Sequence, residues 1–251
     1  MKIVVIGGTG LIGSKLVRNL TEQGHEAVAA APSTGVDTYT GAGLPEVLSG
    51  ASVVVDVSNS PSLDDSALEF FQTATANLLA AERAAGVAHH VALSVVGTAE
   101  LAEQSGYFKA KLAQEKLISD GPVPYTIVHA TQFFEFLATL ADSATFDGTV
   151  RLPAAFFQPM AAADVARGVA AAAVGEPANG IVEIGGPEPV MLPDLIRTAL
   201  TARGDDREVV ADPAAQYWGV DIAERTLVPG DGATLFQTRF EDWVLEAAAK
   251  A

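Results

Sequence analysis

The stretch "VIGGTGLIGSKL", Val5–Leu16, places a glycine-rich turn between an apolar run and a segment with helical spacing. Gly7, Gly10 and Gly13 form G-x-x-G-x-x-G, and Gly8 with the last two also fits G-x-G-x-x-G. Such glycines permit a tight turn, let a pyrophosphate approach the backbone and bring the following helix close to the strand. The amides and dipole at the start of that helix would face the phosphates. The stretch predicts a dinucleotide-binding loop, although a tight turn without a ligand has the same spacing.

Working outward, strand-like and helix-like segments alternate through the first two-thirds of the chain. The expected strands are 2–7, 26–31, 36–40, 52–58, 89–96 and 125–130. The expected helices are 11–23, 64–85, 107–119 and 131–142. Several strands are continuously apolar, as strands buried on both faces of a parallel sheet are. The alternation predicts an α/β fold with a doubly wound parallel sheet (Rossmann), which forms a dinucleotide-binding core over residues 1–147.

After Asp147 the alternation becomes less regular. Strands are expected at 149–153 and 180–186, and helices at 161–174, 192–204 and near 239–250. The chain contains no linker rich in Pro, Gly or Ser and no repeat. Residues 148–251 are therefore predicted to form a small carboxyl-terminal substrate lobe, packed on the core as part of one unit.

Composition excludes several classes of function. The 251 residues include no cysteine, so disulfides and cysteine nucleophiles are excluded, and the four histidines lack metal-ligand spacing. A net charge of -16 argues against a nucleic-acid partner. The amino terminus has neither a signal-peptide layout nor a membrane-spanning apolar run. We expect a soluble cytoplasmic protein with no metal and no membrane partner, as a monomer or homodimer.

The choice between NAD and NADP depends on the end of the second expected strand. An acidic residue there would bind the ribose hydroxyl of NAD, but the chain reads "AAAPSTG" at 29–35. Ser33 and Thr34 could instead hydrogen-bond the additional phosphate of NADP, although no arginine accompanies them. An ordinary turn fits the same residues. We predict a preference for NADP.

Three further residues suggest catalysis. Ser94 ends an expected strand near the carboxyl edge of the sheet, where ligands of such folds bind. Tyr107 and Lys111 are four residues apart and share one helical face. An ammonium beside a phenol would lower the pKa of the tyrosine and make it a usable acid, and a serine could polarise a carbonyl oxygen. Alternatively, Tyr107 is a packing aromatic and Lys111 a surface charge.

With these motifs the chain resembles the atypical short-chain dehydrogenase/reductase superfamily, in its NmrA-like branch of NAD(P)H-binding reductases. The resemblance spans most of residues 1–200 and includes "GGTGLIG" (7–13), "VVVDVSNS" (53–60), "GYFKAKLAQEKL" (106–117), "YTIVHATQFFEF" (125–136) and "MAAADVARGVAAA" (160–172). It implies a proton-donor role for Tyr107. It implies cofactor contacts for Gly7, Thr9, Gly10, Leu11, Ile12, Gly13, Ser58, Asn59, Ser94, Lys111, Thr131 and Phe133.

The chain also departs from the superfamily pattern. The helix asparagine of the superfamily's proton relay would fall near Phe71, and His129 stands where relatives often carry arginine. Some members of the atypical branch lack the tyrosine or do not use it. The fold is therefore better supported than the roles of Ser94, Tyr107 and Lys111.

Aromatic side chains follow the last expected core strand and recur later in the chain. By the same resemblance, several would line an apolar substrate pocket: Phe133, Phe134, Phe157, Met160 and Trp218. Such residues are also common in protein cores.

Together, these features predict an NAD(P)H-dependent oxidoreductase that transfers hydride to a carbonyl, quinone or activated double bond of an apolar small molecule. The alternative is a non-catalytic NAD(P)-binding redox sensor of the NmrA-like type. A nucleotide-sugar isomerase would need a larger carboxyl-terminal lobe and more polar groups.

Overall fold

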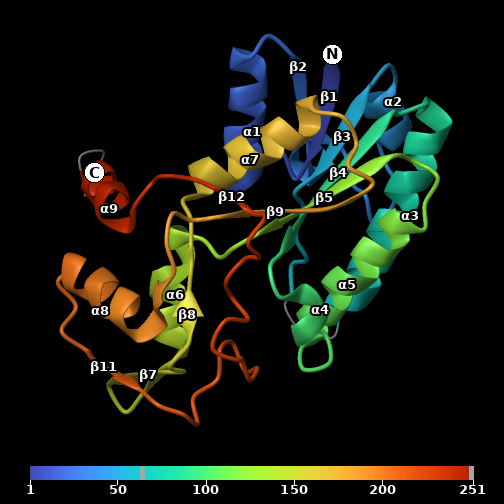
Figure 1. Ribbon diagram of the computed structural model, residues 1–251. Helices are drawn as coiled ribbons and strands as arrows, with labels where there is room; N and C mark the ends of the chain where they lie inside the picture. Colours follow the sequence, from blue (N-terminus) through green and yellow to red (C-terminus); the bar gives the residue numbers. More distant parts are fainter. Residues whose placement is uncertain (63–65, 249–251) are drawn as a thin grey trace.

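The computed structural model in Figure 1 describes residues 1–62 and 66–248. Its centre is a seven-stranded parallel sheet with the order β12-β9-β5-β4-β3-β1-β2. The strands are β1 (Lys2–Ile6), β2 (Glu26–Ala30), β3 (Val53–Asp56), β4 (His89–Val95), β5 (Tyr125–Ala130), β9 (Gly180–Gly185) and β12 (Thr234–Leu235). The predicted doubly wound α/β fold is confirmed.

Helices cover both faces of this sheet (Figure 1). One face carries α1 (Leu11–Glu22) and α7 (Ala162–Val174), and the other carries α2 (Leu44–Leu48), α3 (Ser66–Ala85) and α5 (Gly106–Ser119). Along β1, Ile3 and Val5 pack on the α1/α7 side, whereas Val4 and Ile6 pack on the α2/α3 side. Both faces are buried, which explains the continuously apolar strand sequences. Within the described part of the chain, no helix has the length and apolar character needed to cross a membrane.

The strand order reverses between β1 and β3. From β1 the chain passes through α1 to β2 on one side. From β3 it passes through α3 to β4, and then through α5 to β5, on the other side. Connections that diverge from neighbouring strands leave a crevice outside the carboxyl ends of those strands. The glycine-rich turn follows β1 and lies at this point.

A smaller lobe lies beyond the carboxyl edge of the sheet. It contains the three-stranded sheet β11-β7-β6 and the pair β10-β8. Its elements are η2 (Phe134–Phe136), α6 (Leu137–Ser143), β6 (Thr145–Phe146), β7 (Thr149–Leu152), β8 (Phe156–Phe157), β10 (Val190–Met191), α8 (Leu192–Ala202) and β11 (Glu208–Ala211). Two more helices are α4 (Thr98–Leu101), which follows β4, and α9 (Phe240–Ala248). Although α7, β9 and β12 follow residue 147, they pack on or within the central sheet.

Some expected elements differ from the structure. Residues 36–40 do not form a strand, because the Asp37 carboxylate accepts the backbone N–H of Tyr39 (2.8 Å) and turns the chain. The helix expected at 131–142 starts only with η2 and α6. The described part of α3 begins at Ser66; positions 64–65 and 249–250 of two expected helices lie outside the described residues.

Candidate functional site

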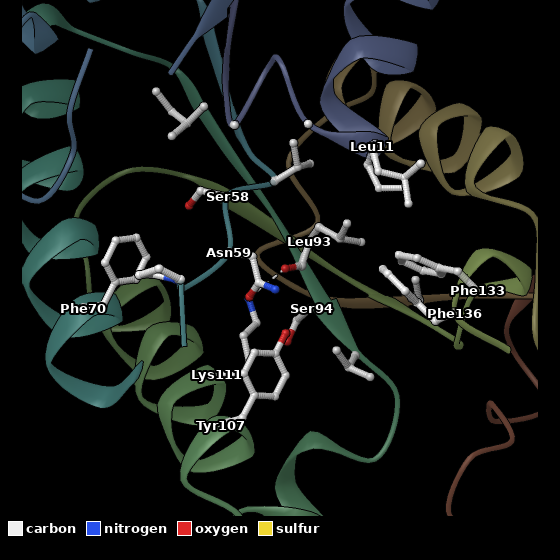
Figure 2. A pocket seen from close by; sticks show the side chains of 18 of the residues that line it. Leu11, Ser58, Asn59, Phe70, Leu93, Ser94, Tyr107, Lys111, Phe133 and Phe136 are labelled. Carbon is white, nitrogen blue, oxygen red and sulfur yellow. Dashed lines mark hydrogen bonds between the residues drawn. The ribbon is translucent and has the colours of Figure 1, made fainter. Parts of the chain in front are cut away.

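A cavity of about 1320 Å³ opens at the carboxyl edge of the sheet, between the core and the lobe. Its walls come from the ends of β1 to β5, from α3, α5 and β8, and from the segments that follow β5 and β11. Figure 2 shows part of this wall, with labelled side chains from α3, β4, α5 and the segments after β3 and β5. Of the predicted site residues, those in the wall are Gly7, Thr9, Gly10, Leu11, Ile12, Ser58, Asn59, Ser94, Tyr107, Lys111, Thr131, Phe133, Phe157 and Trp218.

The glycine-rich turn has the shape that a dinucleotide requires. Gly7 adopts a φ of +77°, and a Cβ there would lie 2.9 Å from the Ser58 nitrogen. Gly13 does not line the cavity, but a Cβ on it would lie only 2.1 Å from the Gly7 carbonyl oxygen. Gly10 caps α1 without a side-chain hydrogen bond, so the first amides of the helix face the cavity mouth. The cradle therefore fits the pyrophosphate of a dinucleotide.

Lys111 is held inside the site by a polar chain that the sequence analysis missed. Its ammonium donates to the Leu93 carbonyl oxygen (2.9 Å) and to Oε1 of Gln114, whose Nε2 donates to Asp56 Oδ2 (3.0 Å). Lys111 is only 3% exposed, and burial lowers its pKa to about 8 against the opposing effect of Asp56 and Glu115. The centroid of the Phe71 ring lies 4.7 Å from the ammonium. Phe71 is the residue expected to replace the asparagine of the superfamily's proton relay.

Tyr107 differs from the prediction in its proton affinity. Burial raises its pKa to about 12, so the predicted lowering by Lys111 is wrong for this structure. Its ring packs edge-on against Phe71 and Phe108, with centroid distances of 6.3 Å and 5.6 Å. The phenol stays protonated at neutral pH, which suits a proton donor and not a base.

Ser94 also differs from the prediction in the direction of its hydroxyl. Its Oγ donates to Oε1 of Glu115, and His129 Nε2 lies 3.0 Å from the same oxygen. The serine proton is engaged in this buried cluster, so Oγ offers lone pairs to the cavity and does not donate to a carbonyl. Glu115 follows Lys111 by four residues, so its helical spacing was a signal that could have identified it.

The end of the cavity near β2 is acidic and aromatic. Tyr39 stacks on Phe70 (centroids 6.2 Å apart) and donates its hydroxyl to Glu69 (3.0 Å), while Asp37 lines the same region. The predicted NADP contacts Ser33 and Thr34 do not line the cavity. Thr34 Oγ1 instead accepts the Ala31 N–H (2.9 Å) within the turn η1 (Pro32–Thr34).

The opposite end is apolar. Phe133, Phe157 and Trp218 lie in its wall, whereas the predicted pocket residues Phe134 and Met160 do not. Phe134 packs in the lobe core against Phe240 and Trp243, and Met160 is fully buried beside the sheet. Burial alone does not separate the two groups, since Phe157 lines the cavity at 1% exposed whereas Phe134 does not at 4% exposed. The direction in which each ring faces decides, and adjacent sequence positions do not reveal it.

Two features of the lining bear on its ligand. Among the described residues, Thr131 Oγ1 and both amide atoms of Gln132 are buried without a hydrogen-bond partner. Buried polar atoms of this kind require a ligand or water. In the described lining, Lys111 is the one lysine or arginine, and carboxylates occur only at the β2 end, on Asp37 and Glu69.

Comparisons with known proteins agree with this architecture. The sequence-family model described as the NAD dependent epimerase/dehydratase family matches residues 3–120. The chain is 28% identical over 248 residues to the (4-alkanoyl-5-oxo-2,5-dihydrofuran-3-yl)methyl phosphate reductase of Streptomyces griseus, covering 90% of this chain and 80% of the relative. These matches do not single out the NmrA-like branch, which stays a prediction.

Solved structures show the same fold. A dTDP-4-dehydrorhamnose reductase from Clostridium acetobutylicum matches with a TM-score of 0.72 and 18% identity, covering 100% of this chain and 99% of that one. The UDP-glucose 4-epimerase of Thermus thermophilus in complex with NAD matches with a TM-score of 0.69 and 21% identity, covering 88% of each chain. The fold is therefore Rossmann-like.

Proposed function

We propose that this protein is an NAD(P)H-dependent oxidoreductase that transfers hydride between the nicotinamide and a carbonyl, quinone or activated double bond of an uncharged apolar molecule. The observation that carries this proposal is that the glycine-rich turn lines the same cavity as Ser94, Tyr107 and Lys111. The family match and the similarity to a reductase support it.

The residues present fit the cofactor. The glycine-rich turn and the first amides of α1 would hold the pyrophosphate, Ser58 and Asn59 the adenosine side, and Lys111 the nicotinamide ribose. Thr131, Gln132 and Phe133 would face the nicotinamide, where buried polar atoms of the first two need partners. When bound, the cofactor supplies the hydride. Tyr107 holds on its Oη the proton that a reduced carbonyl oxygen requires.

The lining supports an uncharged substrate. A phosphate ester or sugar nucleotide is bound through arginine, lysine or several backbone amides. In the described wall, the apolar end has aromatic and aliphatic side chains, and the one cation, Lys111, is already engaged by Leu93 and Gln114. A neutral molecule with a carbonyl group fits this surface better than the phosphorylated compounds named for the relatives.

For the cofactor we propose NADH, in place of the NADP preference predicted from the sequence. The carboxylates of Asp37 and Glu69 line the end nearest β2, and Ser33 and Thr34 do not. Carboxylates repel the additional phosphate of NADPH, and the described lining at this end contains no lysine or arginine to bind it.

A second candidate, a dinucleotide sensor without turnover, is favoured by one observation. The ammonium of Lys111 is already engaged by the Leu93 carbonyl oxygen and by Oε1 of Gln114. A sensor would bind the cofactor and leave all carbonyl compounds unchanged.

Fluorescence titration with NADH and NADPH, followed by turnover on aldehydes, ketones and quinones, tests these proposals. We expect tighter binding of NADH and oxidation of NADH by at least one uncharged carbonyl compound. Tight binding without turnover would support the sensor, and a clear preference for NADPH would contradict the cofactor proposal. Location in the cytoplasm and a monomeric or homodimeric state remain part of the proposal.

A further inference from the structure

A tight turn at residues 217–220 has an unexpected residue in a strained position. The N–H of Tyr217 donates to the Val220 carbonyl (2.9 Å) and the N–H of Val220 to the Tyr217 carbonyl (3.1 Å). The two central residues both have positive φ, 50° at Trp218 and 80° at Gly219. Positive φ at both positions is the signature of a type I′ turn, which favours Asn, Asp or Gly at the first of them.

Trp218 is poorly suited to that conformation. The other two non-glycine residues with positive φ in the described part of the chain are Asp147 and Asn179, types that tolerate it. A bulky aromatic residue in left-handed backbone is strained, and such strain tends to occur at ligand sites. Folding alone would be served better by asparagine at this position.

The turn places the indole in the wall of the cavity. Trp218 is 42% exposed and lines the cavity together with Tyr217, which is 6% exposed. Tyr217 packs between Trp218 (centroids 6.4 Å apart) and Phe157 (6.1 Å). A rigid aromatic surface is thereby held at the apolar end.

This surface also carries hydroxyl groups. Burial raises the pKa of Tyr217, the Trp218 side chain opposes this effect, and the nearby Tyr107 adds to it. Tyr217 from the lobe and Tyr107 from α5 both line the cavity, and both phenols stay protonated at neutral pH. Two phenol donors beside an aromatic wall match an oxygen with two lone pairs on a flat apolar molecule.

We propose that the 217–220 turn is a recognition element for planar, uncharged aromatic carbonyl compounds, which stack on Trp218 and accept a hydrogen bond from Tyr217 or Tyr107. The inference deepens the proposed function and rests on it, because it names the substrate class of the same cavity. The strain at Trp218 then has a binding role.

A matched pair of ketones tests the proposal: α-tetralone, which contains a benzene ring, and its saturated counterpart α-decalone. Their dissociation constants are measured by calorimetry with saturating NAD⁺, which cannot reduce them, on the wild type and on Trp218→Asn. We expect the wild type to bind α-tetralone more tightly than α-decalone. Trp218→Asn should weaken α-tetralone binding on the order of tenfold. The same substitution should raise Tm by about 2 °C, because asparagine suits the turn.

Trp243→Phe serves as the control, because Trp243 packs against Phe134 and Phe240 and does not line the cavity. It should leave both dissociation constants unchanged. Unchanged α-tetralone binding in Trp218→Asn, equal binding of the two ketones, or no binding of α-tetralone would each overturn the proposal. Failure of NADH to bind the wild type would instead contradict the proposed function, and the titrations repeated without NAD⁺ would then decide the role of the turn.

Discussion

At the glycine-loop end of the cavity (Gly7–Ile12) the wall is shaped largely by backbone. At the tyrosine end it is made of side chains, namely those of Ser94, Tyr107, Lys111, Tyr217 and Trp218. The first end depends on the absence of Cβ atoms at a few positions. The second depends on which neighbouring group accepts each side-chain proton. The Ser94 hydroxyl, for example, donates to Glu115. A short motif can therefore specify a binding loop, while the chemistry of the other end depends on contacts made across the fold.

The largest expected effect is at the glycine-loop end. In Gly13→Ala the added Cβ would lie 2.1 Å from the backbone oxygen of Gly7, which cannot move without deforming the turn. We expect NADH affinity to fall at least about a hundredfold, as measured by fluorescence titration.

Gly24→Ala is the matched control, at the other end of α1. Gly24 has a φ of +86° and open space around its Cβ position, so this variant loses some stability without touching the cavity. Its NADH affinity should stay unchanged. If Gly13→Ala bound NADH as the wild type does, backbone shape would not govern this end.

Tyr107→Phe tests the tyrosine end. Removing the hydroxyl that is proposed to donate the proton should lower kcat about a hundredfold or more, with little change in NADH affinity. Tyr125→Phe, at the start of β5 and outside the cavity lining, should keep full activity. Undiminished turnover in Tyr107→Phe would favour a quinone-type reduction that needs no tyrosine.

Ser94→Ala should have a smaller effect than Tyr107→Phe. The Ser94 hydroxyl donates to Glu115, so its loss disturbs positioning and removes no donor from the substrate. We expect kcat to fall by roughly tenfold. Ser143→Ala, whose hydroxyl bonds Leu140 in α6, is the control. A loss as large as that of Tyr107→Phe would mean that Ser94 donates to the substrate after all.

The smallest expected effect is a pH dependence of cofactor binding. The pKa of Lys111 is lowered to about 8, so its ammonium is present below that pH and is lost as the pH rises through it. If the ammonium holds the cofactor ribose, NADH affinity should fall severalfold between about pH 7 and about pH 9.5. The affinity of Lys111→Met should be weaker and flat over this range. A wild-type profile without this decline would remove Lys111 from cofactor binding.

Much of the fold follows from local sequence patterns. The continuously apolar stretches at residues 3–6 in β1 and 53–55 in β3 identify a sheet buried on both faces, and the glycines after β1 identify the turn. The expected strand at 36–40 failed because Asp37 captures a backbone amide, and apolar alternation does not show that competition.

The site could be predicted only in part. Ser94, Tyr107 and Lys111 line one cavity as expected, but their proton arrangement depends on Asp56, Gln114 and Glu115. Asp56 comes from a different strand, so only packing brings it near. Burial reverses the expected shift in the pKa of Tyr107, and spacing along a helix carries no information on burial.

One measurement tests the central claim, that a single cavity brings a dinucleotide and an uncharged carbonyl compound together at Tyr107. The wild type is incubated with NADH carrying deuterium at the reactive carbon of the nicotinamide, in either orientation, and with aryl ketones and aldehydes. Quinones are followed separately by the oxidation of NADH, because a hydroquinone loses its O–D label to water. The account predicts a reduced product that carries one deuterium from one of the two labelled forms. Tight NADH binding with neither deuterium transfer to a ketone or aldehyde nor oxidation of NADH by a quinone would contradict it and identify a sensor.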